Sequence, residues 1–271
     1  LPLRSPNVEW RSTGSAAMKR ILLFALPLVL VAIVGALRWL SPIHAPSPPE
    51  SLNSHLLVHP VASGGVISYV VAPPDGPVIL VNTGDDPKAA AIRSELERLG
   101  RSANDVGAIL LTHGSYDHWA GVKHFPRAVV YASAEDLELV DHARRIRSTW
   151  PRIRMRLKGR PEKPKTMRSV LSAERLVFGQ MVFECVALPG VTKGSTAYRF
   201  DDIVFVGDTL WESDRGFAPP AASWLERPEE VHQVLPRLER YPSSWIATSR
   251  HGLVARKMAL PRGGSTEVDP R

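Results

Sequence analysis

The residues of this chain that could do chemistry collect in three segments. His113, Asp117 and His118 lie within the stretch LTHGSYDHWAG, directly after an apolar run that indicates a buried strand. Asp208 follows a second apolar run, IVFVG, and His251 follows a third strand-like run, WIATS. Imidazole and carboxylate groups are the ligands that a zinc-type ion takes in proteins. Each residue alone would more often be structural, so the five predict a metal site only if the three loops meet.

The elements that must position these loops are strands interleaved with helices. A helix is predicted over PKAAAIRSELERLG, with Asp85 or Asp86 as its cap and Gly100 just past its end. A second helix, with a proline interruption, is predicted over RPEEVHQVLPRLERY. Strands are predicted over GGVISYVVAP, PVILVNTG, VGAILLTHG, AVVYA, RLVFGQMVFECVALPG, AYRFDDIVFVGDTL and WIATSRHG. The alternation favours α/β layers, in which polar residues gather at strand ends.

The order of these segments resembles the metallo-β-lactamase superfamily. Its central loop, T-H-x-H-x-D-H-x-G-G, is similar to Thr112–Gly121, and its P-G-H-T-x-G-S segment is similar to Pro189–Ser195. Its G-D-T-L segment is matched at 207–210, its G-H-G-like turn at 250–252, and its early D-T-G strand end at 82–84. The resemblance covers about Leu56 to Leu260 and implies an αββα sandwich with the site at one edge of two sheets.

The departures from the pattern fall on the metal ligands. By this resemblance the first metal site would map to His113, Ser115 and Val191, and a serine and a valine replace two of its histidines. The second site maps to four residues that are all present, namely Asp117, His118, Asp208 and His251. Asn82 stands where the superfamily has a supporting carboxylate. The resemblance therefore implies one degraded metal site and one complete one.

One divalent metal, with zinc favoured by the ligand types, is therefore the expected cofactor. A single metal at Asp117, His118, Asp208 and His251 leaves a position for water, and His113 is then free to act as general base beside Asp117. The expected activity is hydrolysis of an ester, lactone, lactam or phosphoester of unknown identity. The alternatives are a catalytically inactive binding domain at the membrane surface and metal binding without catalysis.

The first 55 residues predict a membrane connection. Residues 1–17 are interpreted as an upstream extension, and 18–40 as a transmembrane anchor or a signal, because Ile21 to Leu37 carries no charge. Residues 41–55 are a Pro-rich linker, 56–262 the metallo-β-lactamase-like domain and 263–271 a disordered tail. Lys19 and Arg20 predict a single pass through the inner membrane, with the domain on the periplasmic or extracytoplasmic side.

The charge of the chain is uneven. Its formal net charge is +7, yet Arg144 to Arg168 holds eleven Lys or Arg and one acidic residue, Glu162. RIRMRLK within it alternates cationic and apolar residues, which as a strand would give one charged face. The open interpretations are a solvated edge, contact with anionic lipid and an anionic substrate; nucleic acid is not expected as a partner. The single cysteine, Cys185, lies in an apolar run and is expected to pack in the core.

Overall fold

The computed structural model describes residues 57–213 and 216–256. The predicted extension, membrane segment, linker and tail all lie outside these ranges. Among the residues that are described, no helix is long and apolar enough to cross a membrane.

The first sheet carries the strand that precedes the opening loop. Its order is β1-β2-β3-β4-β5-β6, antiparallel from β1 to β3 and parallel from β3 to β6. Strands β2, β3 and most of β4 are buried without alternation, as expected where both faces of a sheet are covered. The strands span Leu57–Ser63, Val66–Ala72, Val78–Val81, Val106–Leu110, Val129–Ala132 and Met167–Ser169.

The second sheet carries the other two predicted loops. Its order is β14-β13-β10-β9-β8-β7, antiparallel except for the parallel pair β10 and β13. Because β10 and β13 run in the same direction, the loops that follow them lie at the same edge. A two-stranded ribbon, β11 (Trp211–Ser213) and β12 (Gly216–Ala218), follows β10. The main strands span Arg175–Phe178, Met181–Ala187, Thr196–Phe200, Ile203–Gly207, Trp245–Thr248 and Gly252–Ala255.

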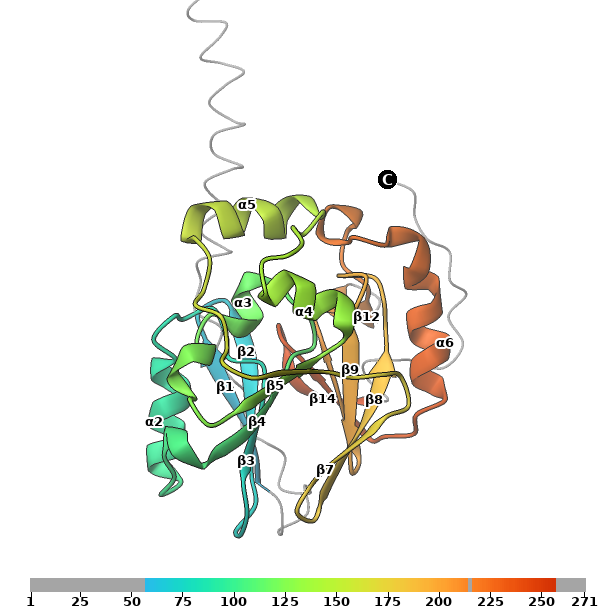
Figure 1. Cartoon of the computed structure of the whole chain (residues 1–271). Coiled ribbons are helices and arrows are strands. Elements are labelled where there is room, and N and C mark those ends of the chain that lie inside the picture. Colours follow the sequence, from blue (N-terminus) through green and yellow to red (C-terminus); the bar gives the residue numbers. More distant parts are fainter. Residues whose placement is uncertain (1–56, 214–215, 257–271) are drawn as a thin grey trace, which may run out of the picture. The chain divides into compact units, whose positions relative to one another are not determined.

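The two sheets face each other and helices cover their outer faces (Figure 1). The central core joins side chains of both sheets, among them Tyr69, Leu110, Phe183 and Phe205. Helix α2 (Ala90–Arg98) packs on the first sheet through Ile92 and Leu96, and α6 (Val234–Glu239) packs on the second. This arrangement confirms the predicted αββα sandwich. Cys185 is fully buried in the central core, as expected.

The cap of α2 separates two neighbouring aspartates. Asp86 accepts hydrogen bonds from the backbone N–H groups of Lys88 and Ala90, at 2.9 and 2.8 Å, so Asp86 serves the helix start. Asp85 is left to face the site. Gly100 has a φ of 67°, which confirms the predicted helix end.

Three helices at the site edge were not predicted from the sequence. Helices α3 (Tyr116–Trp119) and α4 (Ala134–Val140) follow β4 and β5. The strand interpretation of RIRMRLK is wrong, because these residues lie in α5 (Thr149–Lys158). Helical spacing turns Pro151 and Arg154 inward and Arg152, Ile153 and Leu157 outward. The alternation of cationic and apolar residues indicated a strand because cations were expected to be exposed. Once Arg154 is allowed to be buried, the same seven residues also fit the 3.6-residue period of a helix.

Candidate active site

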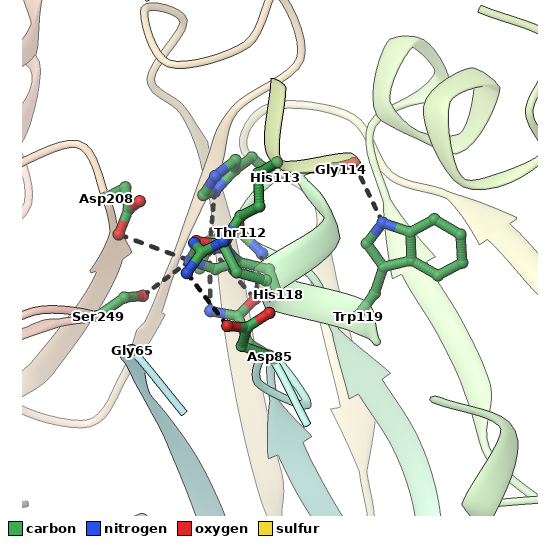
Figure 2. A network of polar contacts seen from close by, with 12 residues as sticks. Gly65, Asp85, Thr112, His113, Gly114, His118, Trp119, Asp208 and Ser249 are labelled. Atoms are coloured by element: carbon green, nitrogen blue, oxygen red, sulfur yellow. Dashed lines mark hydrogen bonds and ion pairs between the residues drawn. The ribbon is translucent and has the colours of Figure 1, made fainter. Parts of the chain in front are cut away.

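The loops after β4, β10 and β13 meet at one edge of the sandwich. His113, His118 and Asp208 each offer a ligand atom there, and these atoms all lie within 4.8 Å of one another. The rings of His113 and His118 are 3.9 Å apart between centroids (Figure 2). All three side chains are buried. Two imidazoles and one carboxylate from two sheets therefore converge, as the sequence required for a metal site.

Contacts on both ring nitrogens orient His118. Its Nε2 lies 3.1 Å from Ser249 Oγ and 3.6 Å from Asp208 Oδ1 (Figure 2). Its Nδ1 lies 3.3 Å from Asp117 Oδ1. A carboxylate on the far nitrogen of a histidine commonly supports metal binding by the near nitrogen. Asp117 is therefore placed behind His118 rather than within the three-residue group.

Two arginines occupy the space around the carboxylates. Arg250 donates to both oxygens of Asp208, from Nε at 3.1 Å and Nη2 at 2.7 Å, and Nη2 also lies 3.0 Å from Asp117 Oδ2. Its Nη1 donates to the Gly65 carbonyl at 2.8 Å. Arg154, on α5, donates to the same Asp117 oxygen and lies 3.1 Å from Asp85 Oδ2. The guanidinium groups supply the positive charge that buried carboxylates need.

Two tryptophan rings lie close to the guanidinium of Arg250. Its guanidinium carbon lies 5.2 Å from the centre of the Trp211 ring and 5.8 Å from that of Trp224. Only 12% of the Arg250 side chain is exposed. The N–H groups of this guanidinium thus bind two carboxylates and a carbonyl, and two indole rings lie nearby. Arg250 is a fixed cation of the site.

His251 does not join the three-residue group. Its backbone N–H donates to Thr248 Oγ1 at 2.8 Å, and its ring stands edge-on to Phe217 at 5.2 Å. Of the five predicted site residues, the structure brings His113, His118 and Asp208 into one cluster, with Asp117 against His118. The neighbour of His251, Arg250, reaches the position between Asp117 and Asp208 instead.

The charges set the protonation of the two histidines. Burial, with repulsion from His118 next, lowers the pKa of His113 to about 3. Burial alone would also lower the pKa of His118, but the carboxylates of Asp208 and Asp117 outweigh it and raise that pKa to about 9. Near neutral pH these shifts favour a neutral His113 and a protonated His118, so the pair carries one positive charge.

The carboxylates stay ionised despite their burial. Burial would raise the pKa of Asp117, but Arg154 and His118 hold it well below its usual range. The Arg250 guanidinium and His118 do the same for the pKa of Asp208. In return, Asp208 and Asp117 raise the pKa of Arg250 above its usual value against the opposing effect of burial. With Lys158 also on Asp85, the carboxylates of Asp85, Asp117 and Asp208 are matched by four cationic groups, namely Arg154, Lys158, Arg250 and protonated His118.

Buried polar contacts hold the His113 loop in place. Asn82, with a φ of 63°, accepts from the Thr112 backbone N–H at 3.0 Å and pairs with the Thr112 hydroxyl. Asp136, at the start of α4, accepts from the Gly114 N–H at 3.0 Å and from the Thr192 hydroxyl at 2.7 Å. Trp119 Nε1 donates to the Gly114 carbonyl at 3.1 Å (Figure 2). These residues fix the backbone on both sides of His113.

The match to known proteins covers most of the described chain. The family model of the metallo-β-lactamase superfamily matches residues 63–251. The chain belongs to the metallo-β-lactamase superfamily.

Curated relatives and solved structures agree with this membership. A hydroxyacylglutathione hydrolase of Cyanothece sp. is 30% identical over 167 residues, 58% of this chain and 54% of that protein. One of Aeromonas salmonicida is 26% identical over 160 residues, 58% of this chain and 52% of that protein. The chain thus spans about half the length of these relatives.

The solved structures share the fold at lower identity. A B3 metallo-β-lactamase with an active-site glutamic acid has a TM-score of 0.58 at 21% identity, over 83% of this chain and 87% of that chain. A metallo-β-lactamase family protein of Thermus thermophilus has a TM-score of 0.59 at 22% identity, over 77% of this chain and 78% of that chain. The chain therefore has the fold of a hydrolase superfamily whose members typically bind divalent metals.

Ser115 and Val191, to which the superfamily resemblance assigns two histidine positions, are both buried beside His113. They line one hollow together with His113, Asp117 and Asp208, and side chains of α5 and of the segment after β10 close it. These covering residues are Pro151, Arg154, Trp211, Pro220 and Trp224. The lining side chains leave no space the size of a water molecule. A ligand can therefore reach His113 and Asp208 only if some of the cover moves.

Three residues of the site were not identified from the sequence. Arg250 could have been identified, because it adjoins the predicted ligand His251 in a loop that follows a strand. Arg154 was hidden in a basic stretch whose cations were interpreted as exposed. Asp136 lies within an element that was not predicted, so nothing marked it as buried.

Proposed function

We propose that this chain is a hydrolase of the metallo-β-lactamase fold that uses one divalent metal, with zinc favoured, held by His113, His118 and Asp208. The observation that carries the proposal is the convergence of these three buried donors from two sheets. Two imidazoles and one carboxylate fit a catalytic zinc layout, provided that His118 gives up its proton to the solvent on binding and that part of the cover moves to leave a position for water. Asp117 behind His118 supplies the usual support for a metal-binding ring. Such an ion would acidify a bound water and polarise a carbonyl or phosphoryl oxygen.

In this proposal Arg250 supplies the positive charge that a second metal would otherwise supply. Arg250 lies between Asp117 and Asp208, the carboxylates that the superfamily resemblance assigns to the second metal position. A fixed guanidinium there can bind a substrate carboxylate, phosphate or developing oxyanion by paired N–H donors. His118 is held in one orientation by Asp117 and Ser249, and Asn82 and Asp136 hold the loop that carries His113. The expected substrate is therefore an anionic ester, thioester, lactone, lactam or phosphoester.

Metal content of single variants tests the ligand set. We expect about one metal per full-length chain after dialysis against zinc, and its loss in His113→Ala and Asp208→Ala. His251→Ala is the matched control, and it should keep the metal because its ring packs against Phe217. Loss in His251→Ala with retention in His113→Ala would instead establish the set Asp117, His118, Asp208 and His251. Hydrolysis of an ester, lactone and phosphoester panel by the parent, absent from Asp208→Ala, would establish the activity.

A metal-free binding domain is the second candidate function. It is favoured by the guanidinium of Arg250, which takes both oxygens of Asp208 and so competes with any metal for that carboxylate. At an effective dielectric constant of about 20, a guanidinium some 4–5 Å from a divalent ion costs several kcal/mol. A parent protein that takes up no zinc, yet binds inorganic phosphate by calorimetry in an Arg250-dependent way, would establish this function instead.

We also propose that residues 18–40 anchor the chain in the inner membrane, with the domain on the extracytoplasmic side. The support is the uncharged run Ile21 to Leu37 preceded by Lys19 and Arg20. The full chain should stay with membranes after alkaline carbonate extraction, and a chain deleted for 18–40 should be released. Release of both would refute the anchor.

A further inference from the structure

Helix α5 exposes large apolar side chains on the surface. Trp150, Ile153 and Leu157 have exposed fractions of 50, 39 and 80%. Their spacing of three and four residues places them in one stripe along the helix. A soluble helix ordinarily turns such a stripe toward the core, whereas α5 turns Pro151 and Arg154 inward. Much of the apolar stripe is therefore left facing solvent, with only Trp150 stacked on another ring, that of Trp224.

The same outer face is basic. Arg152 and Arg156 are exposed next to the stripe, and neither forms an ion pair or side-chain hydrogen bond with any described residue. Arg145, Arg147 and Arg160 flank the helix and are also exposed. Helix α5 itself contains no acidic residue. A charged surface of one sign beside exposed tryptophan, isoleucine and leucine selects a partner that is both anionic and apolar.

The inner face of α5 covers the site. Arg154 is 4% exposed and bonds Asp117 and Asp85, and Pro151 lines the hollow beside His113. Trp150 stacks on Trp224, another covering residue, at 6.4 Å between ring centroids. Helix α5 lies across the edge of the sandwich where the site is, at the top of Figure 1. Whatever binds the outer face of α5 therefore lies directly over the site.

We propose that α5 is an interfacial helix that docks on an anionic lipid surface. Trp150, Ile153 and Leu157 enter the boundary between headgroups and acyl chains, and Arg152 and Arg156 bind lipid phosphates. Short helices with a basic side and tryptophan or leucine on the other side lie in membrane interfaces in this way. A second copy of the chain fits less well, because it would bring the arginines of two helices together. The docking does not depend on whether the site binds metal or turns over substrate.

A fluorophore at the helix tests the docking directly. The full chain carrying Leu157→Cys is labelled with the dye NBD, because Cys185 is fully buried and burial raises the pKa of its thiol to about 12. Vesicles of phosphatidylcholine with phosphatidylglycerol should shift the emission to shorter wavelength, and vesicles of phosphatidylcholine alone should not. Arg152→Glu with Arg156→Glu should abolish the shift.

Val177→Cys provides the matched control. Val177 is also apolar and 65% exposed, but it lies on β7, at the far end of the sandwich from α5 (Figure 1). Its label should not shift, even if another segment anchors the chain to the vesicle. No shift at position 157, or equal shifts at 157 and 177, would overturn the proposal. So would a shift at 157 that grows with protein concentration without vesicles, because that would make a second copy the partner.

Discussion

Removal of Arg250 should uncover a buried acidic pair and make the stability of the fold respond to metal. Arg250→Ala deletes the groups that bind Asp208 at 2.7 and 3.1 Å and Asp117 at 3.0 Å. Both carboxylates are at most 4% exposed. Breaking a buried ion pair from one side typically costs about 3–5 kcal/mol, because the remaining charge loses its partner.

Two features set the size of the effect within that range. Asp117 keeps Arg154, and both carboxylates keep a nearby His118, so compensation remains. Asp208 loses both of its guanidinium bonds, so its charge is the less compensated. We therefore expect a loss near the lower end, roughly 3 kcal/mol. For a domain of this size that corresponds to a fall in Tm of about 6–12 °C.

Zinc should reverse part of the loss. The alanine variant leaves two carboxylates and His118 around an unfilled position, which a divalent ion can take. A ligand at about 100 times its Kd stabilises by roughly 2.7 kcal/mol. Thermal unfolding with a chelator and with excess zinc measures both quantities. The zinc-dependent gain should be larger in Arg250→Ala than in the parent, because in the parent the guanidinium competes for Asp208.

Control variants separate this effect from the loss of any arginine. Arg152→Ala removes an exposed arginine and should change stability by no more than about 0.5 kcal/mol. Arg250→Lys keeps the charge but loses the fork, and should fall between the parent and the alanine variant. An Arg250→Ala protein as stable as the parent in chelator would show that Arg250 does not neutralise the carboxylates, and the reasoning above would fail.

Three further predictions concern the residues that hold the site. Burial raises the pKa of Asp136 to about 7. The folded state therefore binds this proton more tightly than the unfolded state does, so the free energy of unfolding falls as the pH rises from about 4 to 7. Urea unfolding at about pH 5 and about pH 8 should show the parent losing roughly 3 kcal/mol relative to Asp136→Asn, and parallel pH profiles would contradict this. Gly207→Ala places a Cβ against the Thr112 side chain at a φ of 62°, whereas Gly179→Ala has a similar φ of 63° with nothing within 4 Å. The unfolding free energy of both variants should fall by about 1–2 kcal/mol, because alanine is strained at a positive φ. Denaturant midpoints should show an additional loss only in Gly207→Ala. Trp119→Phe leaves the buried Gly114 carbonyl without its indole donor, and should lower the unfolding free energy by about 1–3 kcal/mol; a shift below about 0.5 kcal/mol would show that this bond is dispensable.

Local sequence determined the framework of this protein. The apolar runs before His113, Asp208 and His251 predicted strands that end at one edge, and the order of the motifs predicted the sandwich. The pair Asp85 and Asp86, together with Gly100, marked the ends of α2 because caps depend on neighbours within a few residues; the structure decided for Asp86. The meeting of His113 and Asp208 followed from the same logic, since both lie in loops that follow strands, whereas His118 reaches them from the unpredicted helix α3.

Only the tertiary structure decided which charges meet. Arg250 and His251 are adjacent, and their order in the chain does not reveal which side chain turns toward Asp208 and which toward Phe217. Arg154 and Arg152 look alike in a basic stretch, yet helical rotation buries the first against Asp117 and leaves the second exposed. Asp136 is buried because β5 and α4 pack against the His113 loop from elsewhere in the chain. Rotation about a helix and contact across sheets are long-range properties, so a local pattern of residue types does not contain them.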